Sequence, residues 1–172
     1  MKSDLLISPA EERHLPGLLA IYNQVIAHST AVYSSTPVDL ADRKAWYETR
    51  RGRAFPVLVA IEAGEVAGFA SYGDWRAPSG YAFTVEHSVH VREDRRGQGI
   101  GTALMTALLR QAEAQGKHVM IGGIDASNEG SIAFHRSLGF EVVAQFHQVG
   151  HKFGRWLDLV FMQKRLDSRL TP

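Results

Sequence analysis

Apolar residues along the chain follow two spacings, and the spacing changes where glycine, proline or acidic residues gather. Short continuous apolar runs, as at residues 56–61 and 118–124, are typical of buried strands. Apolar residues three or four positions apart, such as Leu104, Leu108 and Ala112, are typical of helices that bury one face. Strands that alternate with helices predict an α/β fold built on a central mixed sheet.

The predicted elements follow one another as strand, two helices, three strands, helix, strand, helix and two strands. The strands are expected at residues 5–7, 56–61, 66–72, 83–91, 118–124, 140–149 and 156–164. The helices are expected around Leu15, Leu18, Tyr22 and Val25, from a cap at Asp39 to about Arg50, at residues 99–115, and from a cap at Ser127 or Asn128 to Leu138. About four helices therefore flank a twisted mixed sheet, in a single domain over residues 1–172.

Three further features of the pattern predict local structure. The lack of alternation at residues 118–124 predicts burial on both faces, as in a parallel pair of strands. Residues 73–80 are rich in glycine and charge, and they predict a loop. The segment after Arg165 predicts a frayed tail.

A turn rich in glycine and charge joins one predicted strand to the helix that follows it. Gly97, Gly99 and Gly101 leave backbone N–H groups unscreened by side chains, at a helix N-terminus that carries a partial positive charge. Arg95 and Arg96 add full positive charge beside them. This combination predicts a seat for a phosphate or pyrophosphate. The spacing fits neither the Walker pattern nor the dinucleotide-binding fingerprint.

The composition argues against several classes of binding partner and of chemistry. The chain has 172 residues and a formal net charge of +1, whereas nucleic-acid binding normally goes with a clear basic excess. It contains no cysteine, which excludes disulfides and thiolate chemistry. Because no apolar run is long enough to span a bilayer and no signal peptide is recognisable, a cytoplasmic protein without nucleic-acid or membrane partners is expected.

The glycine turn reads Arg96-Gly97-Gln98-Gly99-Ile100-Gly101, which fits the pattern Arg/Gln-x-x-Gly-x-Gly/Ala. It resembles the acyl-coenzyme A loop of the GNAT N-acetyltransferase superfamily. Asn128 and the segments at residues 73–76, 84–89, 138–140 and 152–158 resemble the phosphinothricin and methionine sulfoximine N-acetyltransferases, in a match from about residue 15 to 165. The resemblance implies the GNAT acyl-CoA N-acyltransferase fold, acetyl-CoA as co-substrate, a small amino acid as acceptor, and a homodimer paired near the last strands.

The resemblance also implies which residues bind the coenzyme. Val89 and Val91 lie where the strand splays in GNAT proteins, so that backbone N–H groups can bond the pantetheine arm and polarise the thioester carbonyl. Asn128 can cap a helix and, by resemblance, also bonds this arm. The implied coenzyme-binding residues are Val89, His90, Val91, Arg96, Gly97, Gln98, Gly99, Ile100, Gly101, Thr102, Asn128 and Ser137.

Glu86 lies on the predicted strand that leads into the glycine turn, and it is the candidate base. An amine must lose a proton before it attacks a thioester, and a nearby carboxylate can accept that proton directly or through one water. Strand alternation places Thr84, Glu86, Ser88 and His90 on one face. Two alternatives stay open: Glu86 only positions the amine, or it is an exposed glutamate on a solvated sheet face.

His135 stands where many GNAT enzymes carry a tyrosine that protonates the departing thiolate, and the phosphinothricin branch departs from that pattern in the same way. Because histidine can donate a proton near neutral pH, the role of general acid is implied. The alternative is a helix-surface histidine that hydrogen-bonds the cofactor or water. His87, His90, His147 and His151 show no metal-ligand spacing, so no metal site is expected.

Substrate recognition is expected in the predicted loop at residues 73–80, because loops commonly carry specificity. The Arg76 guanidinium can bind a carboxylate at two points, while Lys152 and Arg155 are second choices for the same anion. The alternative for Arg76 is a solvated surface arginine. The predicted substrate-binding residues are Arg76, Ala77, Pro78, Glu86, His87 and Ser88.

These features predict an enzyme that moves acetyl from acetyl-CoA to the α-amine of a small amino acid by direct attack, with Glu86 as the base. Phosphinothricin, methionine sulfoximine and methionine sulfone are the expected acceptors. Two alternatives stay open: an acetyltransferase for a protein N-terminus or an aminoglycoside, and a non-catalytic sensor of acyl-CoA. Phe153 and Trp156 are expected to form an exposed apolar patch suited to a homodimer.

Overall fold

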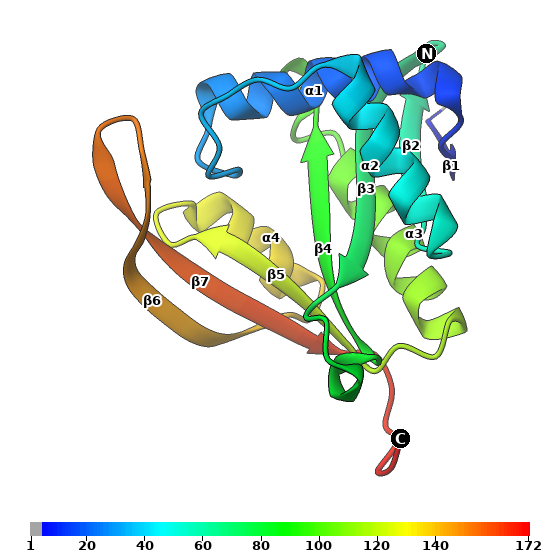
Figure 1. The fold of residues 1–172 in the computed structure, drawn as a ribbon, viewed down its shortest axis with the longest axis vertical. Helices are drawn as coiled ribbons and strands as arrows, with labels where there is room; N and C mark the ends of the chain where they lie inside the picture. The colour runs from blue at the N-terminus through cyan, green and yellow to red at the C-terminus, as the bar shows by residue number, and fades with distance from the viewer. Residues whose placement is uncertain (1–4) are drawn as a thin grey trace.

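A seven-stranded mixed sheet forms the centre of the computed structural model, which describes residues 5–172 (Figure 1). The sheet order is β1-β2-β3-β4-β5-β7-β6, and every neighbouring pair is antiparallel except β4 with β5. The predicted order of elements and the predicted parallel pair are therefore confirmed. The strands are β1 (Leu6–Pro9), β2 (Val57–Glu62), β3 (Glu65–Asp74), β4 (Thr84–Val91), β5 (Val119–Asp125), β6 (Glu141–Lys152) and β7 (Arg155–Arg165).

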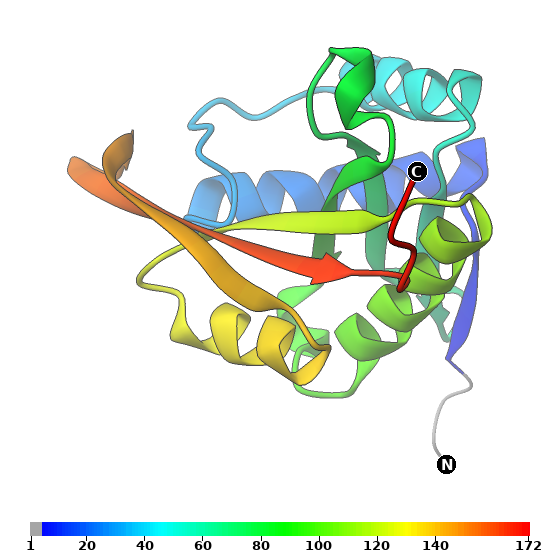
Figure 2. The ribbon, with the colours of Figure 1, turned by 90° about the horizontal axis from the view of Figure 1, so that it is seen from below.

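Four helices cover the two faces of this sheet (Figure 2). On one face lie α1 (Leu15–His28) and α2 (Leu40–Gly52), and on the other lie α3 (Ile100–Ala114) and α4 (Glu129–Ser137). The Asp39 side chain caps α2 by accepting the Asp42 backbone N–H at 2.8 Å. Within residues 5–172, none of these helices combines the length and apolar character needed to cross a membrane.

The alternation of side chains along the central strands divides the core between the two faces. Val85 of β4 packs with Leu104 and Leu108 of α3 in one cluster. Phe69 of β3 packs with Leu18 of α1 in the other. Both faces of β4 are therefore covered, and a polar side chain on this strand is buried unless a cavity opens beside it.

Strands β4 and β5 pair only where both begin, and they then diverge (Figure 1). Their parallel pairing runs from Thr84, opposite Val119, to Glu86, opposite Ile121. In the described chain, the β4 backbone over residues 87–91 has no ladder partner on that side. Unpaired N–H and C=O groups must find other partners, so this edge is suited to binding an extended ligand.

Strand β3 continues farther than the sequence predicted. A loop was predicted from Gly73, but Gly73 and Asp74 extend the strand by pairing with Glu86 and Val85 of β4. The glycine and the charge suggested a break, whereas the ladder with β4 decides the local structure. The loop begins at Trp75 instead.

The segment after β7 is anchored, so the predicted fraying is wrong as far as Arg169. The Leu166 N–H donates to the His118 carbonyl at 2.8 Å. The Asp167 carboxylate lies 2.7 Å from His118 Nδ1 and accepts from Arg169 Nε at 2.7 Å. The contacts to His118 are polar and link distant parts of the chain, which is why the local apolar pattern did not predict them.

Candidate active site

Two cavities meet on the side of β4 that lacks a partner strand. The first, called the α2 cavity, has a volume of about 370 Å³ and is lined by Glu86 and by Trp46 and Arg50 of α2. The second, called the α3 cavity, has a volume of about 680 Å³ and lies between the first turn of α3 and Phe134 of α4. The residues common to both linings are Ala31, Val89, His90 and Asn128. Ligands in the two cavities would therefore meet along β4.

The glycines of the turn before α3 are required for two different reasons. Gly97 and Gly99 have φ angles of +74° and +83°, which side-chain-bearing residues adopt only with strain. Gly101 has ordinary dihedral angles, but a Cβ atom there would lie 3.3 Å from Cζ of Phe134. Close approach of α3 to α4 therefore depends on Gly101, and the shape of the turn depends on the other two.

The first turn of α3 presents its backbone donors to the α3 cavity. Gly99 is the N-cap and offers no side chain to accept a hydrogen bond from the turn. Ile100, Gly101 and Thr102 supply the first backbone N–H groups of the helix, and all three residues line the cavity. These donors and the helix dipole form a seat for an anionic group such as a pyrophosphate.

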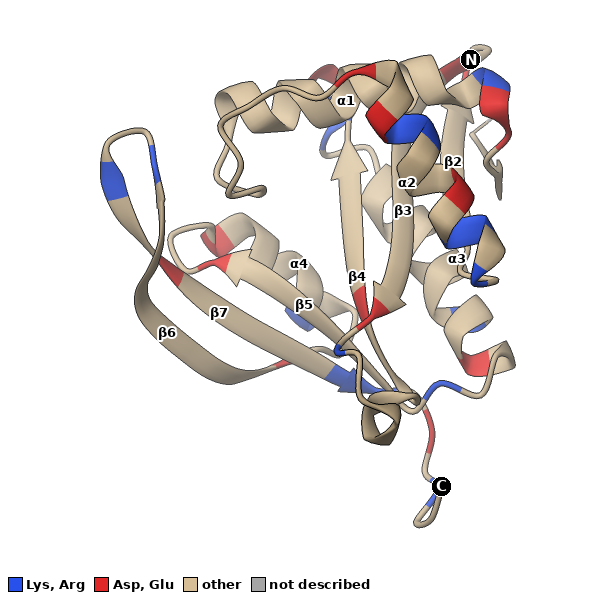
Figure 3. Ribbon diagram, viewed as in Figure 1, with Lys and Arg blue, Asp and Glu red and all other residues tan. Residues whose placement is uncertain are grey.

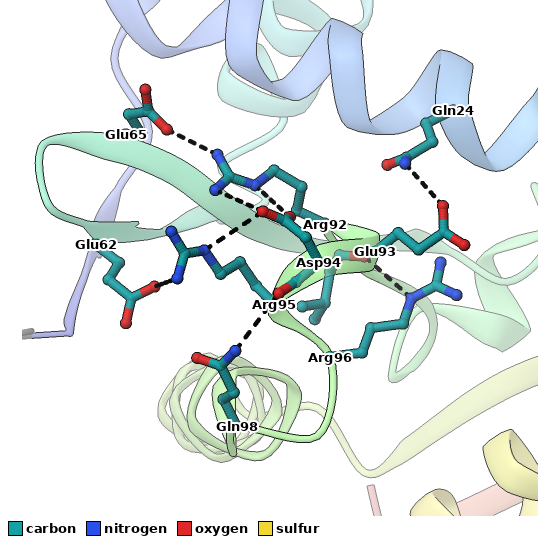
Figure 4. Close-up of polar contacts among 10 residues, drawn as sticks. Gln24, Glu62, Glu65, Arg92, Glu93, Asp94, Arg95, Arg96 and Gln98 are labelled. Atoms are coloured by element: carbon teal, nitrogen blue, oxygen red, sulfur yellow. Dashed lines mark hydrogen bonds and ion pairs between the residues drawn. The ribbon is translucent and has the colours of Figure 1, made fainter. Parts of the chain in front are cut away.

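The arginines beside this turn differ in how free they are (Figure 4). Arg95 is paired with Glu62 at 3.4 Å and with Asp94 at 3.7 Å, so the charge that was predicted to be free has carboxylates beside it. Arg96 forms no ion pair within residues 5–172; its Nε donates to the Val91 carbonyl at 3.4 Å. Both arginines line the α3 cavity, and Arg96 is the one without a carboxylate partner that is available to an anion.

The remaining predicted coenzyme residues divide into two groups. Val89, Val91 and Asn128 line the α3 cavity, and the Asn128 Oδ1 caps α4 by accepting the Ser131 N–H at 3.0 Å. Gln98 and Ser137 lie outside the linings of both cavities. Gln98 Nε2 is 3.5 Å from the Asp94 carbonyl, and the Ser137 hydroxyl donates to the Phe134 carbonyl at 2.6 Å.

Glu86 points into the α2 cavity from the middle of β4. Burial raises the pKa of its carboxyl, and the nearby Arg76 and Arg50 guanidiniums oppose part of that rise. The carboxylate lies against Gly123 of β5, where a Cβ atom would be in ordinary contact with Glu86 Oε1 at 3.5 Å. Glu86 is thus half-buried beside a cavity, and the alternative of an exposed glutamate on an open sheet face is wrong.

His135 projects from α4 into the protein, so it does not lie on the helix surface as the alternative supposed, although the hydrogen-bonding role of that alternative stays open. Its Nδ1 lies 2.7 Å from the Ser131 carbonyl and donates to it, while the buried Nε2 has no partner within residues 5–172. Its ring stacks on that of His87 with centroids 5.1 Å apart. Burial lowers the pKa of His135, so the neutral imidazole with a lone pair on Nε2 is the favoured form.

Two more histidines of β4 are buried on opposite faces. Burial, with repulsion from His135 and His90, lowers the pKa of His87 to about 3. His90 packs against Tyr22 and Phe69, and burial near arginines lowers its pKa to about 4. Both are neutral at physiological pH. Within the described residues, no group of three or more His, Cys, Asp or Glu is arranged to hold a metal ion.

The predicted substrate loop lies at the edge of the site. Arg76, Ala77 and Pro78 are exposed and do not line the α2 cavity, although His87 and Ser88 do. The Arg76 guanidinium stacks over the ring of Trp75, 5.0 Å from its centroid.

Lys152 is wrong as a second choice for the substrate anion. It is 2% exposed, and its Nζ donates to the carbonyls of Ser29 and Val32 at 2.6 and 2.8 Å. This buried ammonium anchors the segment between α1 and α2. Arg155, the other second choice, is exposed and does not line the α2 cavity.

Sequence reasoning missed the side chains of α2 that line the site. Arg43, Trp46 and Arg50 all face the α2 cavity, together with Tyr22 of α1. Their spacing of three and four residues places them on one face of the helix. Two arginines on the face that also carries a tryptophan were the available signal, because an ordinary buried face is apolar.

Comparison with known proteins identifies the family. A family model described as the Acetyltransferase (GNAT) family matches residues 18–140. The chain belongs to this family. The predicted fold class and the predicted resemblance are thereby confirmed.

Two relatives of this GNAT chain carry substrate names. An L-methionine sulfoximine/L-methionine sulfone acetyltransferase from Pseudomonas aeruginosa is 57% identical over 92% of this chain and 93% of that protein. A phosphinothricin N-acetyltransferase from Alcaligenes faecalis is 34% identical over 90% of this chain and 79% of that protein. Both lie in the branch that the sequence motifs indicated.

Two solved structures share the fold over nearly their whole length. An acetyltransferase from Salmonella typhimurium, solved with its cofactor acetyl-CoA, has a TM-score of 0.95 and 46% identity, covering 98% of this chain and 97% of that one. A ribosomal-protein-alanine N-acetyltransferase from Brucella melitensis has a TM-score of 0.92 and 49% identity, covering 93% and 99%. The GNAT chain is therefore an acetyl-CoA-dependent N-acetyltransferase, and a non-catalytic sensor is set aside.

Proposed function

We propose that the enzyme transfers the acetyl group of acetyl-CoA to the α-amine of a small amino acid such as methionine sulfone, methionine sulfoximine or phosphinothricin. The observation that carries this proposal is the meeting of the two cavities at the divergence of β4 from β5. One cavity offers an anion seat, and the other offers a carboxylate flanked by guanidiniums. The names of the relatives support this acceptor class.

The α3 cavity is proposed to hold the coenzyme. The N–H groups of residues 100–102 and the Arg96 guanidinium would bind the pyrophosphate. The open edge of β4, at Val89 and Val91, would bond the pantetheine arm, with Asn128 on the opposite side. A β4 backbone N–H placed at the thioester carbonyl would stabilise the oxyanion of the transition state.

Glu86 is proposed to accept the proton of the attacking amine, directly or through one water. Its raised pKa brings the carboxyl nearer to the operating pH, where a base shares a proton most effectively with its substrate. Partial burial withdraws part of the carboxylate from bulk water, which strengthens its interaction with an ammonium group.

His135 is proposed to protonate the departing thiolate through Nε2. Its Nδ1–H is held by the Ser131 carbonyl, so Nε2 is the nitrogen that can exchange a proton. Since the resting form is neutral, Nε2 must first take up a proton, and the source is the second proton that the acceptor nitrogen loses when the attacking amine becomes an amide. The alternative left from the sequence is that Nε2 only accepts a hydrogen bond.

A homodimer is part of the proposal. The β6–β7 hairpin extends away from the rest of the sheet and exposes apolar side chains (Figure 1). Phe153 is 58% exposed and Trp156 is 66% exposed. A second copy of the chain would cover this apolar surface.

The test is an acetyl-transfer assay that follows release of the coenzyme thiol. With methionine sulfone as acceptor, we expect saturable thiol release and an N-acetylated product of the corresponding mass. Release that does not rise above acetyl-CoA hydrolysis at millimolar acceptor would contradict the proposed substrate class, while leaving the family assignment intact.

A further inference from the structure

Arg50 lies on the inner face of α2, directly above the end of β3. A Cβ atom at Gly73 would overlap Nη1 of Arg50, so the guanidinium occupies the space where a side chain of residue 73 would lie. Gly73 pairs with Glu86 across β3 and β4, and directly opposed positions carry adjacent side chains. The Arg50 guanidinium and the Glu86 carboxylate therefore lie next to each other in the α2 cavity.

No carboxylate within residues 5–172 forms an ion pair with Arg50. Asp74 is the carboxylate with the largest electrostatic effect on Arg50, but it is already paired with Arg53. Arg43, on the same face of α2, is held at two nitrogens by Asp42, at 3.0 and 2.7 Å. Of the two α2 arginines that line the cavity, Arg43 thus has a carboxylate partner and Arg50 does not. Figure 3 shows both signs of charge along this helix.

The Arg50 side chain is also partly withdrawn from water. Its Nε is buried and has no hydrogen-bond partner among the described residues. Its guanidinium carbon lies 5.8 Å from the centroid of the Trp46 ring. An unpaired guanidinium held against an aromatic ring in a cavity has donors ready for a planar anion, because guanidinium matches a carboxylate at two points.

We propose that Arg50 binds the α-carboxylate of the acceptor while Glu86 binds its α-amine, so that the two side chains together recognise the zwitterion of a free amino acid. This assignment rests on the proposed function and specifies its acceptor. The two charges of a free amino acid are separated by one carbon atom. Among the charged residues that line the α2 cavity, Arg43 is held by Asp42 and Asp74 by Arg53, while the Arg50 guanidinium lies beside the Glu86 carboxylate in the complementary arrangement.

The assignment of Arg50 predicts that this enzyme differs in acceptor specificity from acetyltransferases that act on protein N-termini. A peptide N-terminus has an amide where a free amino acid has its α-carboxylate. Such an acceptor would leave Arg50 without its anion, and a partly buried charge without a partner is unfavourable. The enzyme should therefore acetylate a free amino acid much better than the matching amide.

The experiment is a thermodynamic cycle that combines a substitution of Arg50 in the enzyme with removal of the carboxylate charge from the acceptor. Methionine sulfone and its primary amide are compared by kcat/KM at one pH and saturating acetyl-CoA. We expect the wild type to prefer the acid by roughly ten- to a hundredfold, the contribution of a charge-assisted bond. In Arg50→Met this preference should fall to within about threefold, with little change for the amide.

Two further variants serve as a control and as an independent test. Arg51→Met removes an exposed arginine of the same helix and should keep the wild-type preference. Gly73→Ala retains Arg50 but displaces its guanidinium, so it should also lose the preference, and it supplies the answer if Arg50→Met does not fold.

Other outcomes would overturn the assignment. An unchanged preference in folded Arg50→Met, an equal loss on both acceptors, or a preference lost only in Arg76→Met would each reject Arg50 as the carboxylate site while leaving the acetyltransferase proposal intact. Failure of the wild type to acetylate methionine sulfone at all would reject the proposed function and this assignment together.

Discussion

Glu86 carries the proton transfer in the proposed reaction, and it offers the most direct test at the scale of a residue. Glu86→Gln keeps the size of the side chain but cannot accept a proton. We expect kcat to fall by about a hundredfold or more, the usual contribution of a general base, with the acetyl-CoA KM almost unchanged. Steady-state kinetics, with each substrate varied separately, measure this split.

The pH dependence separates the two roles left open for Glu86. If it is the base, the deficit of Glu86→Gln shrinks at high pH, where more of the acceptor is already a free amine. A deficit that is constant across pH would indicate ammonium binding instead. Glu141→Gln, which changes an exposed glutamate of β6, is the matched control and should behave as the wild type.

Arg76 is expected to contribute to binding of the acceptor's anionic groups from the edge of the cavity. Arg76→Ala should raise the acceptor KM by roughly ten- to a hundredfold and leave the acetyl-CoA KM nearly unchanged. Arg76→Lys should restore only part of the loss, because an ammonium cannot make the planar two-point contact. An unchanged acceptor KM would reject this role, and since Lys152 is occupied, Arg50 would then carry the anion site alone.

The cavity-lining residues that could be predicted from the sequence are those with a recognisable local sequence pattern. Glu86 was identifiable because a carboxylate interrupts a strand, and Gly99 because a helix begins after it. Arg50 was missed because its cavity exists only when α2 lies over β3, which no local pattern describes. Lys152 was misjudged for the same reason, since its carbonyl partners lie more than a hundred positions away in sequence.

At the scale of an element, the turn before α3 should determine coenzyme binding. Gly99→Val strains a residue with φ of +83° beside the backbone donors, and Gly101→Val drives a side chain against Phe134. Both variants should lose detectable coenzyme A binding in calorimetry while remaining folded. Gly80→Val, at a glycine with open space and no positive φ, is the control, and unchanged affinity in folded Gly99→Val would reject the anion seat.

The order and type of the elements were predictable because strands and helices have different apolar periods. The residues at which the elements end were less predictable. The last residues of β3 follow the ladder with β4, and the segment after β7 is anchored by contacts to His118. Both depend on residues far away in sequence, whereas the cap of α2 at Asp39 is local and was predicted.

At the scale of the whole molecule, the buried histidines predict the acid side of the stability profile. His87 has a pKa of about 3 in the folded chain, against about 6.5 when unfolded. The unfolded state therefore binds more protons between these values, and the free energy of unfolding falls as pH drops below about 6.5. At pH 5 this one residue should cost about 2 kcal/mol.

Urea unfolding at pH 7 and pH 5 measures this loss. His87→Asn should reduce the difference between the two pH values by about 2 kcal/mol, whereas His28→Asn, at an exposed position, should not. An identical pH dependence in wild type and His87→Asn would show that His87 is not held neutral by the fold.

The assembly is predicted to be a dimer through the β6–β7 hairpin. Light scattering should give twice the mass of the chain, and Trp156→Asp should shift the protein to a monomer by placing a charge in the covered apolar surface. Leu6→Asp, at an exposed apolar residue of β1 on the opposite edge of the sheet, should remain dimeric. A monomeric wild type at assay concentration would contradict this part of the account.

The central claim is that the two cavities bring acetyl-CoA and an amino acid together at the divergence of β4 from β5. A crystal structure with coenzyme A and methionine sulfone tests it most directly. We predict the pyrophosphate at the N–H groups of residues 100–102, the thiol between β4 and β5, and the acceptor amine within hydrogen-bond distance of Glu86 or of a water bound to it. An acceptor bound outside the α2 cavity, or an amine remote from Glu86, would contradict the account.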